Sequence, residues 1–113
     1  MTVLVLAGGL GTRMQAVAGN VPKALLPVGE HTFLYYQLQW LKLIGFDRVV
    51  LALGHRSQQI ESYVSSLCKQ DPERKVFPEV VFVDEGKELL GTGGAIRNAL
   101  HLLPEDFVVT YGD

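Results

Sequence analysis

The sequence predicts an α/β fold in three layers, αβα, with helices on both faces of a mostly parallel sheet. Three observations predict it: short apolar runs recur along the chain, amphipathic helical segments separate these runs, and glycines follow several of them. Alternating strands and helices are the pattern of βαβ units, which build parallel sheets. Because parallel strands end at one edge of the sheet, the loops that follow them are expected to converge on a single ligand site.

Four apolar runs are the expected strands. The first, Thr2–Leu6, is short and rich in β-branched residues, as buried parallel strands are. The others are Arg48–Leu53, Val80–Val83 and Phe107–Thr110. No run reaches the length of a membrane span, and no positively charged segment precedes the first run, so the chain is expected to be soluble and not exported by a leader.

A helix is expected between the first two strands, over Phe33–Ile44. Thr32 is its expected N-cap, and Gly45 is expected to end it. Leucines recur in this segment at i, i+4 and i+7, which predicts a buried face widened by aromatic neighbours. The residues expected in the core are Leu34, Leu38, Leu41, Phe33, Tyr35, Tyr36, Trp40 and Ile44.

Two further helices are expected later in the chain. Ser57 can cap one of them, and a charged segment with two prolines, residues 69–78, is expected to follow it as a surface loop. The other helix is expected after Gly91 and to end at Pro104. Their expected apolar faces consist of Ile60, Val64 and Leu67 in the first, and of Ala95, Ile96, Ala99, Leu100 and Leu103 in the second.

Residues 6–14, Leu-Ala-Gly-Gly-Leu-Gly-Thr-Arg-Met, form a glycine-rich loop directly after the first strand. Its glycines let backbone amides approach a phosphate closely, and Arg13 and Lys23 supply positive charge. The loop does not match a dinucleotide-binding fingerprint, because Met14 stands where the third glycine is needed. It does not match a Walker A loop either, because no Gly-Lys pair follows the first glycines. The loop therefore predicts a polyphosphate site of another type.

This loop, G-G-x-G-T-R-M with a lysine ten residues after the arginine, resembles the signature of the sugar-1-phosphate nucleotidyltransferases, the pyrophosphorylases that make nucleotide sugars. Leu90–Ala95 and Tyr111–Asp113 agree with two later segments of that family, in the same order. One departure is Ala24, where many members have proline. The wording is most similar to guanylyltransferases that act on mannose or heptose 1-phosphates.

The resemblance implies a Rossmann-like, GT-A-like nucleotidyltransferase, with residues 1–113 as a single nucleotide-binding domain that is the N-terminal part of a longer catalytic domain. It implies that a nucleoside triphosphate and a sugar 1-phosphate react, with Mg²⁺ as cofactor, to give an NDP-sugar and pyrophosphate. It assigns catalytic phosphate neutralisation to Arg13 and Lys23, and metal binding to Asp113. The nucleotide-binding residues that it implies are Leu6, Ala7, Gly8, Gly9, Gly11, Thr12, Glu85 and Gly91.

Guanine is the expected base. Where related enzymes place a glutamine before the Gly-Thr-Gly-Gly segment, this chain has Asp84 and Glu85, with Glu88 nearby. A carboxylate can accept hydrogen bonds from both N1–H and the exocyclic amine of guanine, whereas a pyrimidine lacks that paired edge. The alternative for these residues is a solvated acidic turn.

The net charge and the cysteine and histidine content of the chain limit the kinds of ligand and partner that are expected. The net charge is −2, and no Lys and Arg cluster is interleaved with aromatics, so nucleic acid is not expected as a partner, nor is a membrane. Cys68 is the only cysteine, which excludes an internal disulfide and fits the cytoplasm. The histidines His31, His55 and His101 lack metal-ligand spacing, although His55 could border the site. The sequence does not determine the oligomeric state and is compatible with a homo-oligomer.

Two other functions stay open at the level of the sequence. One is a cytidylyl- or guanylyltransferase of isoprenoid or molybdenum-cofactor synthesis, whose loops also begin with Ala-Gly-Gly. The Gly-Thr-Arg and Gly-Thr-Gly-Gly wording argues against it. The other is a nucleotide-binding or regulatory module without turnover, because the family's sugar-phosphate site and second metal-binding carboxylate are expected beyond Asp113.

Overall fold

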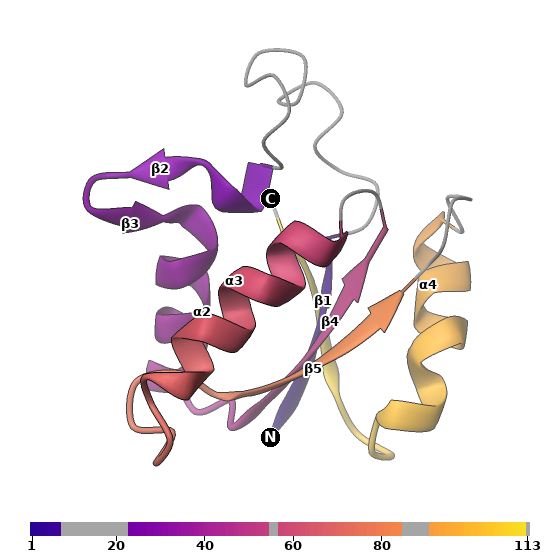
Figure 1. Cartoon of the computed structure of the whole chain (residues 1–113). Helices are drawn as coiled ribbons and strands as arrows, with labels where there is room; N and C mark the ends of the chain where they lie inside the picture. Colours follow the sequence, from indigo (N-terminus) through magenta and orange to yellow (C-terminus); the bar gives the residue numbers. More distant parts are fainter. Residues whose placement is uncertain (8–22, 55–56, 85–90, 113) are drawn as a thin grey trace.

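The computed structural model describes residues 1–7, 23–54, 57–84 and 91–112. Four of the described strands form a sheet in the order β5-β4-β1-β6, and each pairing in it is parallel. In Figure 1, helices α2 and α3 cover one face of this sheet and α4 covers the other. The predicted three-layer α/β fold is confirmed. The sheet strands are β1 (Thr2–Leu6), β4 (Arg48–Leu53), β5 (Glu79–Asp84) and β6 (Val108–Tyr111); the helices are α2 (Phe33–Leu43), α3 (Ser57–Lys69) and α4 (Gly91–Ala99).

Strand β1 is buried along its whole length, and its side chains alternate between two cores. Val3 and Val5 pack with α2 and α3, whereas Leu4 and Leu6 pack with α4. Both faces of a parallel sheet are covered in this way, so the strand is apolar at every position and does not alternate between polar and apolar residues. This arrangement explains why the four expected strands are all found, with boundaries shifted by one residue at most.

Helix α2 begins and ends where the sequence predicts. Thr32 caps it, with its Oγ1 accepting a hydrogen bond from the Tyr35 amide at 3.1 Å. At the other end Gly45 adopts φ +114°, a conformation that favours glycine. The amides of Gly45 and Phe46 then donate to the carbonyls of Lys42 and Leu41 at 3.2 and 3.0 Å, the hydrogen-bond pattern of a Schellman cap.

The prediction that the aromatic residues of α2 belong to the core is wrong for Tyr36 and Trp40, whereas Tyr35 packs against the core. The leucine stripe is buried as predicted, but Trp40 is 57% exposed and Ile44 is 50% exposed. Tyr36 is also exposed, and Tyr35 is half-buried with its ring stacked on His31. The reason is geometric: the sheet covers only one side of the helix, and the leucines fill that side.

The third expected helix ends earlier than predicted. Helix α4 stops at Ala99 and continues only as a short 3₁₀ helix, η2 (Leu100–Leu102). Leu103 is extended, with φ −106° and ψ 144°, because a residue before proline avoids helical geometry. Leu100, predicted to be in the core, is consequently 52% exposed.

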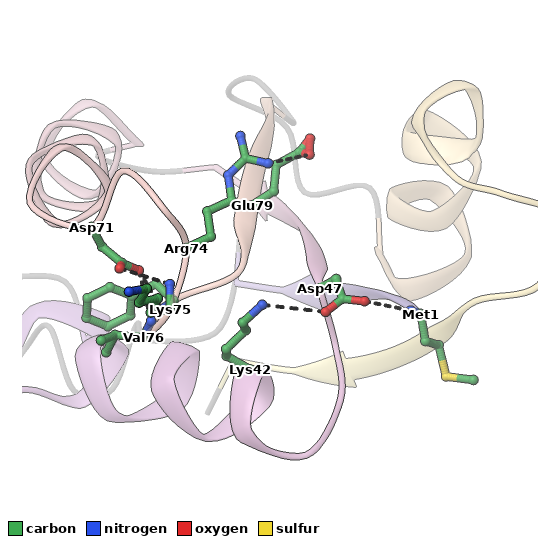
Figure 2. Close-up of polar contacts among 9 residues, drawn as sticks. Met1, Lys42, Asp47, Asp71, Arg74, Lys75, Val76 and Glu79 are labelled. Atoms are coloured by element: carbon green, nitrogen blue, oxygen red, sulfur yellow. Dashed lines mark hydrogen bonds and ion pairs between the residues drawn. The ribbon is translucent and has the colours of Figure 1, made fainter.

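Residues 70–78 have no regular structure, as predicted, but they are not purely a surface loop, because Phe77 is 5% exposed and Pro78 is fully buried. The Asp71 carboxylate orders the segment by accepting hydrogen bonds from the Phe77, Val76 and Lys75 amides at 2.9, 3.0 and 3.0 Å (Figure 2). These hydrogen bonds hold the pKa of Asp71 below its ordinary value, and the bond from the Phe77 amide has the largest effect.

Two short strands were not predicted. Strands β2 (Pro27–Val28) and β3 (His31–Thr32) pair antiparallel, and the 3₁₀ helix η1 (Lys23–Leu25) precedes them. The turn is Gly29-Glu30, with Gly29 at φ +63°. A Gly-X pair between two short segments is a known hairpin signal, so the sequence contained the information.

We expect Leu38→Ala to lower the free energy of unfolding by about 2–5 kcal/mol, because it leaves a cavity beneath α2. Leu100→Ala is the matched control, since this leucine is half exposed, and should cost less than about 1 kcal/mol. Urea unfolding followed by circular dichroism measures both. Equal losses would contradict the assigned core.

Asp71→Asn should lower stability at neutral pH, since the ionised acceptor is removed. The pKa of Asp71 is lower in the folded chain than its ordinary value of 3.8. Its stabilisation is therefore present above pH 3.8 and is lost as the pH falls through the folded-state pKa. The urea midpoints of the wild type and the variant should differ at pH 7 and converge in acid. Equal midpoints at pH 7 would contradict the assigned role of the carboxylate.

Candidate nucleotide site

The carboxyl ends of β1, β4 and β6 are joined by backbone hydrogen bonds. The Ala7 amide donates to the Ala52 carbonyl of β4 at 2.9 Å, and the Gly112 amide donates to the Leu6 carbonyl at 2.9 Å. The first glycine-loop residues, Leu6 and Ala7, therefore lie between the ends of two neighbouring strands. The predicted convergence of the first loop and the Tyr-Gly-Asp segment on one edge is confirmed for these residues.

Gly112 permits this contact because it has no side chain. A Cβ at this position would lie 3.1 Å from the Ala7 Cβ and 3.4 Å from the Leu6 carbonyl oxygen. The first distance is shorter than an ordinary van der Waals contact, and the second is at the lower limit of such contacts. The glycine of the Tyr-Gly-Asp motif is therefore explained by backbone packing against the start of the phosphate loop.

Lys23 lies at the start of η1, in the segment that leads from the glycine loop to the hairpin. Ala24 and Leu25 pack against the core between the sheet and α2, and the Phe33 amide donates to the Leu26 carbonyl at 3.0 Å. The main chain at Lys23 is consequently fixed by packing and by the start of α2. A basic residue just before such an anchor has a defined backbone position for contacting an anion.

Gly91 is the first residue of α4. The orange, N-terminal end of this helix lies at the arrowhead end of β5 in Figure 1, and so on the same edge of the sheet as the carboxyl ends of the strands. Asn98 donates through Nδ2 to the Asp84 carbonyl at 3.4 Å, which connects the helix to β5. Free amides at a helix N-terminus are a favourable environment for negative charge.

Several predicted site residues lie outside the described residues, so their positions stay predictions. These residues are Gly8, Gly9, Gly11, Thr12, Arg13, Glu85 and Asp113, together with His55. The structure describes Leu6, Ala7, Gly91 and the backbone of Lys23. Leu6 and Ala7 lie where the carboxyl ends of β1, β4 and β6 meet. Sequence reasoning missed Gln37, whose Nε2 donates to the Tyr111 carbonyl at 3.4 Å and links α2 to β6. No local pattern distinguishes this glutamine from any other on the helix.

Within residues 1–7, 23–54, 57–84 and 91–112, no three side chains from His, Cys, Asp and Glu gather closely enough to hold a metal ion. In the same ranges, no helix is long and apolar enough to cross a membrane. Burial raises the pKa of the Cys68 thiol, which argues against a thiolate nucleophile there. Among the described residues, the group at this edge that suits an anionic ligand is the N-terminus of α4 at Gly91.

Comparison with known proteins agrees with this chemistry. A family model described as MobA-like NTP transferase domain matches residues 3–113. The chain is similar to D-glycero-alpha-D-manno-heptose 1-phosphate guanylyltransferase of Aneurinibacillus thermoaerophilus, with 32% identity over 109 residues, which are 96% of this chain and 44% of that protein. It is also similar to a probable glucose-1-phosphate cytidylyltransferase of Bacillus subtilis, with 28% identity over 127 residues, covering 100% of this chain and 50% of that protein.

Solved structures show the same likeness. The crystal structure of HddC from Yersinia pseudotuberculosis matches with a TM-score of 0.79 and 39% identity, over 99% of this chain and 47% of that one. The same protein complexed with GMP-PN matches over the same shares with a TM-score of 0.77 and 38% identity. The predicted GT-A-like nucleotidyltransferase fold is confirmed. The chain spans about half the length of the relatives that it matches.

We expect Gly112→Ala to cost about 1–3 kcal/mol of stability, because the added Cβ presses on Ala7. The variant should also bind nucleotide more weakly, since the start of the phosphate loop is displaced. Gly93→Ala is the matched control: nothing lies within 4 Å of its added Cβ, and alanine favours the helix by up to about 1 kcal/mol. Thermal unfolding and nucleotide titration of both variants check this. An undisturbed Gly112→Ala variant would contradict the close packing.

Proposed function

The chain belongs to the MobA-like NTP transferase domain family, and from this we propose that it is the nucleotide-binding half of a sugar-1-phosphate nucleotidyltransferase. The single observation that carries the proposal is the packing of Gly112 against Leu6 and Ala7, because it joins two segments of the family signature at one sheet edge. The similarity to guanylyl- and cytidylyltransferases of sugar 1-phosphates supports it.

The proposed reaction is an in-line displacement at phosphorus. A phosphate oxygen of the sugar 1-phosphate attacks the α-phosphorus of the nucleoside triphosphate, and the bond from the α-phosphorus to the bridging oxygen breaks. Pyrophosphate leaves with that electron pair. The attacking oxygen is already ionised at neutral pH, so no general base is needed. The barrier is mainly the approach of two anions, and catalysis consists of positioning them and neutralising charge.

The residues of the first loop are proposed to hold the triphosphate. The amides of Gly8, Gly9, Gly11 and Thr12 would surround phosphate oxygens. The Arg13 guanidinium and the Lys23 ammonium would neutralise charge that builds up as pyrophosphate departs. Support comes from β1, which fixes the start of this loop between β4 and β6.

Asp113 is proposed to hold Mg²⁺. It directly follows Gly112, whose amide is bound to the end of β1, and a carboxylate oxygen is a hard ligand of the type that Mg²⁺ prefers. When bound, the ion would draw charge from the phosphate oxygens.

GTP is the proposed donor. The main chain of Leu6, Ala7 and Gly8, the Glu85 carboxylate and the start of α4 at Gly91 would together surround the base and the phosphates. A carboxylate that accepts from both N1–H and the exocyclic amine selects guanine over pyrimidines. The similarity to a heptose 1-phosphate guanylyltransferase supports this choice.

The single free cysteine, Cys68, fits a cytoplasmic setting for the enzyme.

Calorimetric titration with GTP, CTP, UTP, dTTP and ATP, each with and without Mg²⁺, tests the proposal. We expect saturable binding of GTP that Mg²⁺ strengthens. Lys23→Ala and Arg13→Ala should each weaken it about 10- to 100-fold, because each removes a charge-assisted contact with phosphate. Lys69→Ala, at the far end of α3, is the control and should bind like the wild type. Equal affinity in all variants would contradict the phosphate assignment, and preference for another base would contradict the role of Glu85.

A further inference from the structure

A side-chain hydrogen bond crosses from helix α2 to strand β6. Gln37 is half-buried on α2, three residues after Leu34 and four before Leu41, so it lies at the border of the buried leucine stripe. Its Nε2 donates to the Tyr111 carbonyl at 3.4 Å. Only the nitrogen of the amide group can donate to a carbonyl, so this contact also fixes which way the Gln37 amide points.

The Tyr111 carbonyl and the Gly112 amide belong to one peptide group, which is held from two sides. The Gly112 amide donates to the Leu6 carbonyl of β1 at 2.9 Å, and the Tyr111 carbonyl accepts from Gln37. A trans peptide group is planar, and its N–H and C=O point in opposite directions. Two hydrogen bonds, one to β1 and one from α2, therefore fix the rotation of this plane.

The orientation of this peptide group matters because a glycine follows it. Glycine adopts more backbone conformations than any other residue, so Gly112 does little by itself to direct the chain onward. Another residue would fit poorly, since a Cβ here would lie 3.1 Å from the Ala7 Cβ. The direction in which the chain leaves β6 consequently depends on how firmly the peptide group before Gly112 is held.

We propose that Gln37 is a positioning residue for Mg²⁺ binding: by holding the Tyr111 carbonyl, it orients the main chain that leads to Asp113. This inference rests on the proposed function, in which Asp113 holds the ion. Mg²⁺ demands nearly octahedral geometry, so its affinity depends on how accurately a ligand carboxylate is placed. A side chain that fixes the main chain two residues before such a ligand acts on metal binding without contacting the metal.

The contact is not needed to hold α2 in place. The leucines of α2 are buried against the sheet, Thr32 caps the first turn, and the hydrogen bonds at Gly45 and Phe46 close the last turn. A hydrogen bond of 3.4 Å to a main-chain carbonyl adds little to these interactions. Removal of the Gln37 amide should therefore leave the fold unchanged, and its effect should appear in metal binding.

The first test examines the contact without any ligand. Gln37→Met keeps the length and the helix propensity of the side chain and removes the donor. The NMR signals of the Tyr111 carbonyl carbon and the Gly112 amide nitrogen should shift, because they report hydrogen bonding to their peptide group. Gln39→Met, at an exposed position of the same helix, is the matched control and should leave both signals unchanged. Signals that move equally in both variants, or in neither, overturn the proposal.

The second test measures GTP binding by calorimetry with and without Mg²⁺. The ratio of the two affinities reports how much the ion strengthens binding. In Gln37→Met this ratio should fall about 3- to 10-fold, because a hydrogen bond that orders the approach to the metal ligand is lost, while the affinity without Mg²⁺ stays that of the wild type. Gln39→Met should keep both wild-type values. An unchanged ratio in Gln37→Met, or an equal loss with and without Mg²⁺, overturns the proposal.

A double variant shows whether Gln37 acts through the Asp113 carboxylate. Asp113→Asn alone should lose the strengthening of GTP binding by Mg²⁺. The addition of Gln37→Met should then cause no further loss, since the ligand that Gln37 positions is gone. A further, independent loss in the double variant would assign Gln37 to the stability of the fold and overturn the proposal.

The same titrations separate this inference from the proposed function. If GTP binding by the wild-type chain does not respond to Mg²⁺, the proposed metal site is contradicted and the role of Gln37 is overturned with it. If the wild type responds and Gln37→Met responds equally, the proposed metal site stands and only the role of Gln37 is overturned.

Discussion

The burial of β1 on both faces is the constraint on which the other elements depend. Its side chains fill two cores, so helices must cover both sides of the sheet, and β4 and β6 must flank it in parallel. The strand is fixed at both ends as well. Met1 is held by Asp47, through a backbone hydrogen bond of 3.2 Å and an ion pair of 3.7 Å, and Leu6 accepts the Gly112 amide (Figure 2 shows the ion pair). The loop that follows Leu6 therefore starts from a rigid point, as a phosphate-binding loop requires.

The sequence predicted the elements whose residue pattern is typical of one structure only. Continuous apolar runs identify strands buried on both faces, and Thr32 and Gly45 identify the ends of α2 through hydrogen bonds and φ angles that few other residues provide. The convergence of Leu6, Ala7 and Gly112 was likewise predictable, because it follows from parallel topology alone. The glycine cradle, Arg13 and Asp113 stay predictions, since they lie outside the described residues.

The wrong predictions concern how neighbouring segments bury or end an element, and not whether the element is a helix or a strand. Trp40 and Ile44 extend the apolar stripe of α2 in sequence, but the width of the buried face is set by how many neighbours cover the helix. Leu100 continues the helical spacing of α4, but Leu103 is forced out of the helix by the proline after it. Phe77 is buried in a charged segment because Asp71 folds that segment back onto the core. Each outcome depends on tertiary contacts that no local window contains.

Three ion pairs of the described residues lie at the amino edge of the sheet. Arg48 and Arg74 both pair with Glu79, at 3.7 and 3.6 Å, and Lys42 pairs with Asp47 at 3.5 Å, all near the amino ends of strands. Figure 2 shows the Arg74 and Lys42 pairs on this side. At the carboxyl ends of β1, β4 and β6, by contrast, the acceptors of the described hydrogen bonds are main-chain carbonyls: Ala52 accepts from Ala7, Leu6 accepts from Gly112, and Tyr111 accepts from the Gln37 side chain. Because a carbonyl acceptor carries no net charge, these bonds join the strands at the carboxyl edge without placing a carboxylate among them. Ion pairs between side chains thus brace the amino edge, whereas main-chain carbonyls hold the strand ends together at the edge where the candidate nucleotide site lies.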